Sequence, residues 1–105
     1  MAELLYSSER KFQVWAYTVS HRQLLLRSVK SATDQTRINL LFKNVRALNL
    51  ISTLQGIRIE ASDQASDKTR YEIESLNFSG FVLASAFAHR TDDQEYGAPS
   101  PFAGF

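Results

Sequence analysis

A two-residue alternation of apolar and polar side chains in residues 37–43 constrains the fold of this chain more than any other feature. Arg37 and Asn39 lie on one side of the alternation, and the other side carries Ile38, Leu40 and Phe42. Successive side chains of a β-strand point to opposite faces, so this period predicts one apolar face and one mostly solvated face. Leu41 is an exception, because it is apolar on the polar side. The period returns before and after this stretch, which predicts a strand in the middle of a sheet.

The same period predicts further strands along the chain, each bounded by polar or glycine-containing stretches. They cover residues 11–20, 23–30, 47–52, 57–62, 70–76 and 81–89. Two segments stay open. Residues 1–9 form an edge strand or a helical turn. After Phe42 the chain forms a bulge or tight bend near Asn44, or else a short helical turn over residues 45–48. In the last predicted strand, Phe87 and Val82 lie on opposite faces. Residues 63–68 are predicted to form a solvated loop that joins two strands of a hairpin.

These strands predict an all-β protein of six or seven antiparallel strands in a meander, folded as a β-sandwich or a partly closed barrel. A chain of 105 residues is expected to be one domain. We assign residues 1–90 to a single β domain and residues 91–105 to a tail that is first acidic and then rich in Pro and Gly. Pro and Gly disfavour regular structure in the tail. Its expected anchors on the domain are the two large apolar residues Phe102 and Phe105.

Composition restricts the setting in which the chain works. An apolar share of 44% is typical of a globular protein, and the absence of cysteine excludes disulfides and thiolate chemistry. The N-terminus shows no signal peptide and no stretch is long enough to span a membrane as a helix, which favours a small cytoplasmic protein of bacterial type. Residues 1–90 carry a net charge of +4 and residues 91–105 a net charge of −3. The acidic tail is therefore able to fold back onto the basic body.

No catalytic or metal-binding motif is present. His21 and His89 are the only histidines, and neither stands at a metal-ligand spacing. Glu72 and Glu74 share one strand face about 7 Å apart, a spacing seen in glycosidases, but neighbouring arginines are expected to keep both carboxylates ionised. The sequence predicts no enzyme, no cofactor and no metal.

A second apolar face is the strongest functional signal. The first three predicted strands carry enough apolar residues on one face to form a core, yet their other face is apolar too. Such a face must be covered by the rest of the domain, by the tail, by a second subunit or by another protein. The predicted interaction face consists of Trp15, Tyr17, Val19, Leu25 and Leu41.

Three functions follow from these observations. The first is a non-enzymatic protein-interaction module that self-associates through the predicted interaction face or a sheet edge. The second is a small-ligand-binding barrel, which needs a cavity among the aromatic side chains. The weakest is a nucleic-acid-binding sheet, which would combine exposed aromatic rings with basic residues. Those residues are Trp15, Tyr17, Arg22, Arg27, Arg37 and Lys43. The expected partner is therefore a second copy or another protein, and not a membrane.

Overall fold

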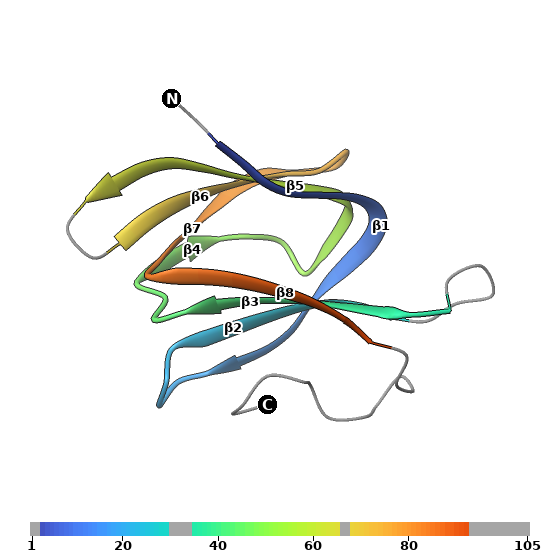
Figure 1. Cartoon of the computed structure of the whole chain (residues 1–105), viewed down its shortest axis with the longest axis horizontal. Coiled ribbons are helices and arrows are strands. Elements are labelled where there is room, and N and C mark those ends of the chain that lie inside the picture. The colour runs from blue at the N-terminus through green and yellow to red at the C-terminus, as the bar shows by residue number, and fades with distance from the viewer. Residues whose placement is uncertain (1–2, 30–34, 66–67, 93–105) are drawn as a thin grey trace.

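A computed structural model describes residues 3–29, 35–65 and 68–92, and within these ranges it contains strands and no helix (Figure 1). The strands are β1 (Glu3–Thr18), β2 (Gln23–Ser28), β3 (Arg37–Lys43), β4 (Ala47–Asn49), β5 (Thr53–Ala65), β6 (Lys68–Glu74), β7 (Ser79–Ala84) and β8 (Ala86–Asp92). The predicted all-β class is confirmed. The open segment at the N-terminus is a strand from Glu3 onward.

The strands form one antiparallel sheet in the order β4-β7-β6-β5-β1-β2-β3-β8. Its two edges, β4 and β8, do not pair with each other, so the sheet is open, as a sandwich or partly closed barrel requires. There are eight strands rather than six or seven, and the order is not a simple meander, because β1 lies between β5 and β2. The prediction that residues 37–43 lie in the middle of the sheet is wrong. β3 is next to the edge strand β8, and the middle belongs to β5 and β1.

β1 reaches both halves of the sheet because it bends sharply (Figure 1). Its register with β5 shifts between Ser8 and Lys11, which pair with Ile57 and Gln55 and leave two residues of β1 opposite Gly56. Gly56 has a φ of 76°, a conformation that glycine adopts without steric cost. The strands predicted over residues 47–52 and 57–62 place Gly56 between two strands, whereas β5 begins at Thr53 and runs through Gly56.

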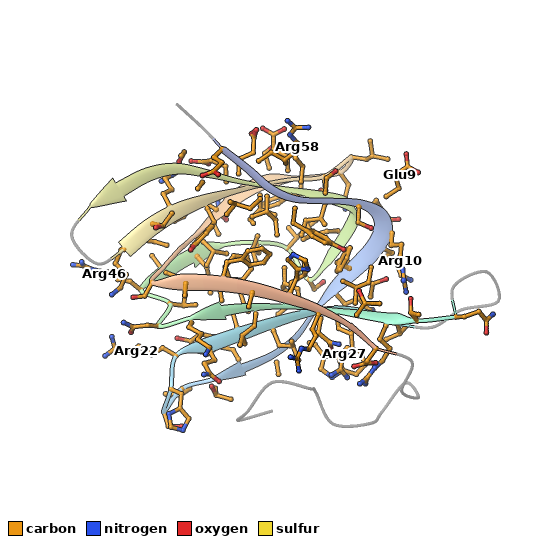
Figure 2. The ribbon with its side chains drawn as sticks, in the orientation of Figure 1. Glu9, Arg10, Arg22, Arg27, Arg46 and Arg58 are labelled. Carbon is orange, nitrogen blue, oxygen red and sulfur yellow. The ribbon has the colours of Figure 1, made fainter. Side chains whose placement is uncertain are left out.

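The side chain of Arg10 lies at this bend and links β1 to the ends of β2 and β3 (Figure 2). Its guanidinium donates hydrogen bonds to the hydroxyl oxygens of Ser28 and Thr36 at 3.0 and 3.1 Å. It also donates to the backbone carbonyl oxygens of Val29 and Thr36. A side chain of β1 therefore ties together the ends of β2 and β3, and it satisfies carbonyl groups beyond the regular ladder.

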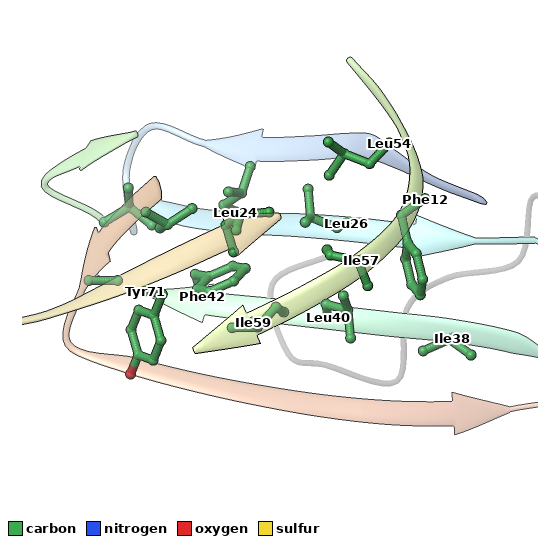
Figure 3. Close-up of a cluster of buried hydrophobic side chains, with 14 residues drawn as sticks. Phe12, Leu24, Leu26, Ile38, Leu40, Phe42, Leu54, Ile57, Ile59 and Tyr71 are labelled. Atoms are coloured by element: carbon green, nitrogen blue, oxygen red, sulfur yellow. The ribbon is translucent and has the colours of Figure 1, made fainter. Parts of the chain in front are cut away.

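The core lies between the two halves of the sheet (Figure 3). Its buried residues are Phe12, Leu24, Leu26, Ile38, Leu40, Phe42, Val45, Leu54, Ile57, Ile59, Tyr71, Ile73, Val82 and Ala84. Phe42 links the halves, because its ring lies 5.4 Å from that of Tyr71 on β6 and 5.0 Å from that of Phe87 on β8. Burial raises the pKa of Tyr71 above its ordinary value, against a weaker opposite effect of a hydrogen bond with Thr69.

The prediction of one strand over residues 81–89 is wrong, because the chain bends at Ser85 and divides into β7 and β8. The amide of Ser85 donates to the carbonyl of Lys43 at 2.9 Å and holds this corner. The bend also changes the phase of the side chains. Ala84 belongs to the core, and Phe87 packs against the same core, although residues three apart on an unbroken strand would face opposite sides.

Two other local predictions are settled by the structure. The expected bend near Asn44 is confirmed, since Asn44 has a φ of 55° and β4 follows it; no helical turn forms there. The predicted loop over residues 63–68 is wrong in length, because β5 continues to Ala65 and β6 begins at Lys68. The predicted hairpin is confirmed by the antiparallel pairing of β5 with β6.

Candidate interaction surface

A β-bulge at Trp15 divides the predicted interaction face. Val14 pairs with Leu26 and Tyr17 pairs with Leu24, so β1 has one residue more than β2 across this stretch. Leu24 and Leu26 share the core face of β2, which places Val14 and Tyr17 on that face of β1 as well. Trp15 and Tyr17 were expected on one face, and the register shows that this expectation is wrong.

Trp15 lies instead on the face of the sheet that is turned away from the core. The guanidinium carbon of Arg27 lies 4.7 Å from the centroid of the Trp15 ring. Arg27 alternates with core residues on β2, so it and Trp15 share the opposite face. A guanidinium at this distance from an indole makes a cation–π contact. The Trp15 ring and the Arg27 guanidinium therefore already contact each other and are not open to stack on a nucleic-acid base.

This opposite face, which we call the second face, consists of Leu25, Arg27, Arg37, Asn39 and Leu41. All of them are buried: Leu25 and Leu41 are 1% exposed, Arg27 2%, and Arg37 and Asn39 are fully enclosed. The prediction that Arg37 and Asn39 lie on a solvated face is wrong. Both are held by hydrogen bonds that the two-residue period alone does not reveal.

Those hydrogen bonds form a polar ladder of Arg27, Asn39, Asp92 and Arg37 across β2, β3 and β8. Arg27 Nε donates to Asn39 Oδ1 at 2.8 Å, and Asn39 Nδ2 donates to Asp92 Oδ2 at 3.1 Å. Arg37 makes a bidentate pair with Asp92 at 2.8 and 2.9 Å. Buried polar groups are tolerated when they satisfy one another in this way, and the paired geometry fixes the register of the strands.

Burial lowers the pKa of Arg27, and the positive charge of Arg37 lowers it further, while Asp92 acts in the opposite direction. The hydrogen bonds of the polar ladder given above thus join two guanidiniums and one carboxylate through the Asn39 amide.

A different part of the molecule leaves apolar side chains open to solvent. Residues 45–52 run beside the second half of β1 and the turn between β1 and β2. One backbone hydrogen bond joins the two stretches of chain at each end. The amide of Val14 donates to the carbonyl of Ser52 at 2.9 Å, and the amide of Val45 donates to the carbonyl of Arg22 at 2.8 Å. Between these points β4 pairs with β7 instead of β1. The two strands therefore leave a gap in the sheet, which we call the open seam.

The apolar residues of the open seam are Val14, Tyr17, Leu48 and Ile51. Their exposed fractions lie between 36% and 43%. Leu48 pairs with the core residue Val82, so it points to the same side of the sheet as Tyr17, the side that elsewhere forms the core. Core-facing side chains are thus exposed where the two halves of the sheet do not close. Val19 is 82% exposed in the adjoining turn.

The predicted interaction residues therefore fall into two groups. Tyr17 and Val19 are exposed at or beside the open seam, whereas Leu25 and Leu41 belong to the second face and Trp15 lies beside it, against Arg27. Sequence reasoning missed Val14, which the bulge moves to the seam. It also missed Leu48 and Ile51, and the available signal was the loss of regular alternation among the apolar residues of positions 45–52. Phe102 and Phe105, the expected tail anchors, lie outside the described residues.

The two histidines lie in different places. His21 is exposed in the turn between β1 and β2, and His89 on β8 packs against Tyr6, with ring centroids 4.8 Å apart. Burial raises the pKa of Tyr6, which a hydrogen bond with Ser8 and the charge of Arg10 partly oppose. No group of three or more His, Cys, Asp or Glu within the described ranges is arranged to hold a metal ion.

The carboxylates on β6 belong to a surface charge ladder. Glu72 accepts hydrogen bonds from Arg70 Nε at 2.5 Å and from Ser62 Oγ at 2.9 Å. Burial raises the pKa of Glu72, but the hydrogen bonds from Arg70 and Ser62 and the charge of Arg70 outweigh it, so the pKa is lowered. Glu72 is therefore ionised near neutral pH, as the sequence predicted, and cannot serve there as a general acid.

A surface hollow of about 350 Å³ lies outside the bend of β1. It is lined by Ser8, Glu9, Gln55, Gly56, Ile57, Arg58, Glu74, Ser75 and Leu76. None of these side chains is aromatic, whereas a ligand barrel was expected to have a cavity among aromatic rings. The core aromatic side chains Phe12 and Phe42 are fully enclosed by their neighbours.

No protein-family model, no curated protein and no solved structure matches this chain. Among the described residues, none forms a helix long and apolar enough to cross a membrane.

Proposed function

We propose that this chain is a non-enzymatic protein-interaction module, working in the cytoplasm, that self-associates through the open seam. The observation that carries the proposal is the exposure of Val14, Tyr17, Leu48 and Ile51 beside strand segments that lack a hydrogen-bonded neighbour across the seam. Removing a large apolar side chain from water contributes roughly 1.5–3 kcal/mol, and unpaired strand edges add backbone hydrogen bonds to such a contact.

A second copy suits this surface when it approaches in an antiparallel, two-fold arrangement. Arg22 and Arg46 are exposed at one end of the open seam (Figure 2), and Val14 and Ser52 lie at the other end. A two-fold axis across the seam sets the basic end of each copy against the neutral end of its partner, so like charges stay apart. The same patch then serves both copies.

The other two functions have less support. A nucleic-acid-binding sheet would need Arg27 and Arg37 to reach phosphates, and both are buried in the polar ladder. A ligand barrel would need an aromatic cavity, and the hollow outside the β1 bend lacks aromatic lining.

Sedimentation equilibrium of the wild-type chain and of Tyr17→Lys and Leu48→Lys variants tests the proposal. We expect a dimer for the wild type and a dimerisation constant weakened at least about tenfold in each variant, which corresponds to ~1.4 kcal/mol of lost contact. Leu76→Lys is the matched control, because Leu76 is 93% exposed in the turn after β6 and lies outside the seam. A wild type that stays monomeric at high concentration, or variants that dimerise like the control, would show the proposal to be wrong.

A further inference from the structure

Three connections between strands meet at one corner of the molecule. The amide of Val45, after β3, donates a hydrogen bond to the carbonyl of Arg22, in the β1–β2 turn, at 2.8 Å. The amide of Ser85, between β7 and β8, donates to the carbonyl of Lys43 at 2.9 Å. Backbone hydrogen bonds therefore fix the three connections against one another. We define the basic corner by four exposed side chains on these connections: Val19, Arg22, Lys43 and Arg46.

Two residues at this corner have a left-handed backbone conformation. Arg22 has a φ of 52° and Asn44 a φ of 55°, and elsewhere in the described part of the chain a positive φ occurs only at Gly56. Asparagine tolerates this conformation, but for arginine it is uncommon and carries a steric cost. Such strain persists where the surroundings hold it, and it is enriched at functional sites. The hydrogen bond from Val45 holds Arg22, so the turn presents this cation from a fixed backbone.

The cations of the basic corner are not neutralised by the described part of the chain. Arg22 and Arg46 lie at the same end of the molecule (Figure 2). Neither they nor Lys43 form an ion pair with a described residue. The two-fold arrangement proposed for the open seam does not neutralise them either, because it sets this end of each copy against the neutral end of its partner. Three positive charges on one corner therefore suit an anionic partner.

Val19 adds an apolar side chain to the same corner, where it is 82% exposed in the turn that contains Arg22. A single exposed apolar residue is ordinary at a protein surface. Leu76 is such a case, because it is 93% exposed beside a hollow whose charged lining includes Glu9 and Glu74 as well as Arg58. The surroundings of Val19 differ, since the connections at the basic corner carry Arg and Lys but no Asp or Glu.

We propose that the basic corner docks on an anionic phospholipid surface. Arg22, Lys43 and Arg46 meet the headgroup phosphates, and Val19 enters between the headgroups. The aliphatic side chain of Val19 favours a lipid surface over a nucleic acid, because it offers no ring on which a base stacks. Docking of this kind needs no membrane-spanning stretch and does not depend on self-association. It revises the expectation of no membrane partner, which rested on the absence of such a stretch from the sequence.

Co-sedimentation of the full-length chain with lipid vesicles tests this proposal. We expect binding to vesicles of phosphatidylcholine and phosphatidylserine in equal parts, no binding to phosphatidylcholine alone, and an affinity that falls as salt is added. In the Lys43→Gln/Arg46→Gln variant the affinity should fall at least about tenfold, because two charges at the membrane surface are lost. Lys11→Gln/Arg58→Gln is the matched control. It removes the same charge from exposed positions away from the corner and should weaken binding less than about twofold.

Several results would overturn the proposal. Equal losses in the two double variants would mean that binding follows net charge and not the basic corner. The absence of binding to the mixed vesicles at low salt would contradict lipid docking. A chain that ignores these vesicles but binds a single-stranded oligonucleotide through Lys43 and Arg46 would assign the corner to nucleic acid instead.

A fluorescent label measures whether the apolar tip enters the membrane interface. The chain contains no cysteine, so Val19→Cys provides a unique site for an environment-sensitive dye and keeps the three cations in place. We expect the emission to shift to the blue and to rise several-fold with the mixed vesicles. Leu76→Cys, labelled in the same way, is the control and should not respond. A silent label at position 19 on a chain that sediments with the vesicles, or equal responses at both positions, would show the proposed orientation to be wrong.

Discussion

Arg27 and Asn39 lie directly opposite each other on β2 and β3, and the Nε of the first donates to the Oδ1 of the second at 2.8 Å on the second face. The amide nitrogen of Asn39 in turn donates a hydrogen bond to the carboxylate of Asp92. One neutral side chain thus connects a buried guanidinium to a partly buried carboxylate, and its amide dipole satisfies both.

Replacement of Asn39 by Ala is therefore expected to destabilise the chain by about 1–3 kcal/mol, because it leaves a buried donor on Arg27 and a partly buried acceptor on Asp92 without this partner. Urea unfolding followed by circular dichroism measures the change. Asn49→Ala, at an exposed position of β4, is the control and should change the free energy of unfolding by less than about 0.5 kcal/mol. Similar losses in the two variants would argue against a structural role for the polar ladder.

Arg10 gives a second prediction. Arg10→Met keeps the apolar stem but removes the donors that bind Ser28, Thr36 and Val29, so we expect a loss of about 2 kcal/mol in the free energy of unfolding. Arg58→Met is matched in chemistry but removes only an exposed pair with Glu60 at 3.3 Å, which contributes about 0–1 kcal/mol. Amide hydrogen exchange at the ends of β2 and β3 should accelerate in the first variant and not in the second.

Gly80 gives a third prediction, which concerns the placement of β4. A Cβ atom at position 80 would lie 1.9 Å from the carbonyl oxygen of Asn49 and 2.5 Å from the ring of Phe78. Gly80→Ala must therefore displace the end of β4 from β7, and we expect destabilisation of about 1–3 kcal/mol. Ser79→Ala, at the neighbouring exposed position, is the control. Thermal unfolding of both variants measures the difference, and an unaltered melting temperature in Gly80→Ala would be inconsistent with the close approach.

Much of the fold could be predicted from the sequence because side-chain alternation records which residues face a core. Residues 37–43 were predicted as a strand with the bounds that β3 has. Alternation fails where a bulge or corner changes the phase. Trp15 and Ser85 are such points, and neither carries the glycine that signals the bend at Gly56. Each error put the residues beyond it on the wrong face.

The candidate site was harder to predict for a related reason. Alternation classes Arg37 and Asn39 as solvated because charged and amide side chains usually are. Their burial depends on Asp92, more than fifty positions further along the chain, and no local pattern connects residues so distant in sequence. The open seam depends in turn on β4 pairing with β7 rather than with β1, which is a choice between two non-local pairings.

The charge ladder on β5 and β6 gives a prediction about pH. The lowered pKa of Glu72 means that its ionised form is stabilised in the folded chain, by Arg70 and Ser62, more than in the unfolded chain. This contribution is fully present above the unfolded pKa of about 4.3 and is lost as the pH falls through the lower, folded pKa. The wild type should therefore exceed Glu72→Gln in stability at pH 7, and the difference should shrink once the pH falls below about 4.

Urea midpoints measured between pH 3 and pH 7 test this dependence. Glu9→Gln, which changes an exposed glutamate on β1, provides the control and should show a smaller pH-dependent difference from the wild type. A stability difference for Glu72→Gln that stays constant over the whole range, or that grows on acidification, would mean that the hydrogen bonds from Arg70 and Ser62 do not favour the ionised carboxylate. Glu72 would then contribute to the stability of the fold only through side-chain packing on the surface of β5 and β6.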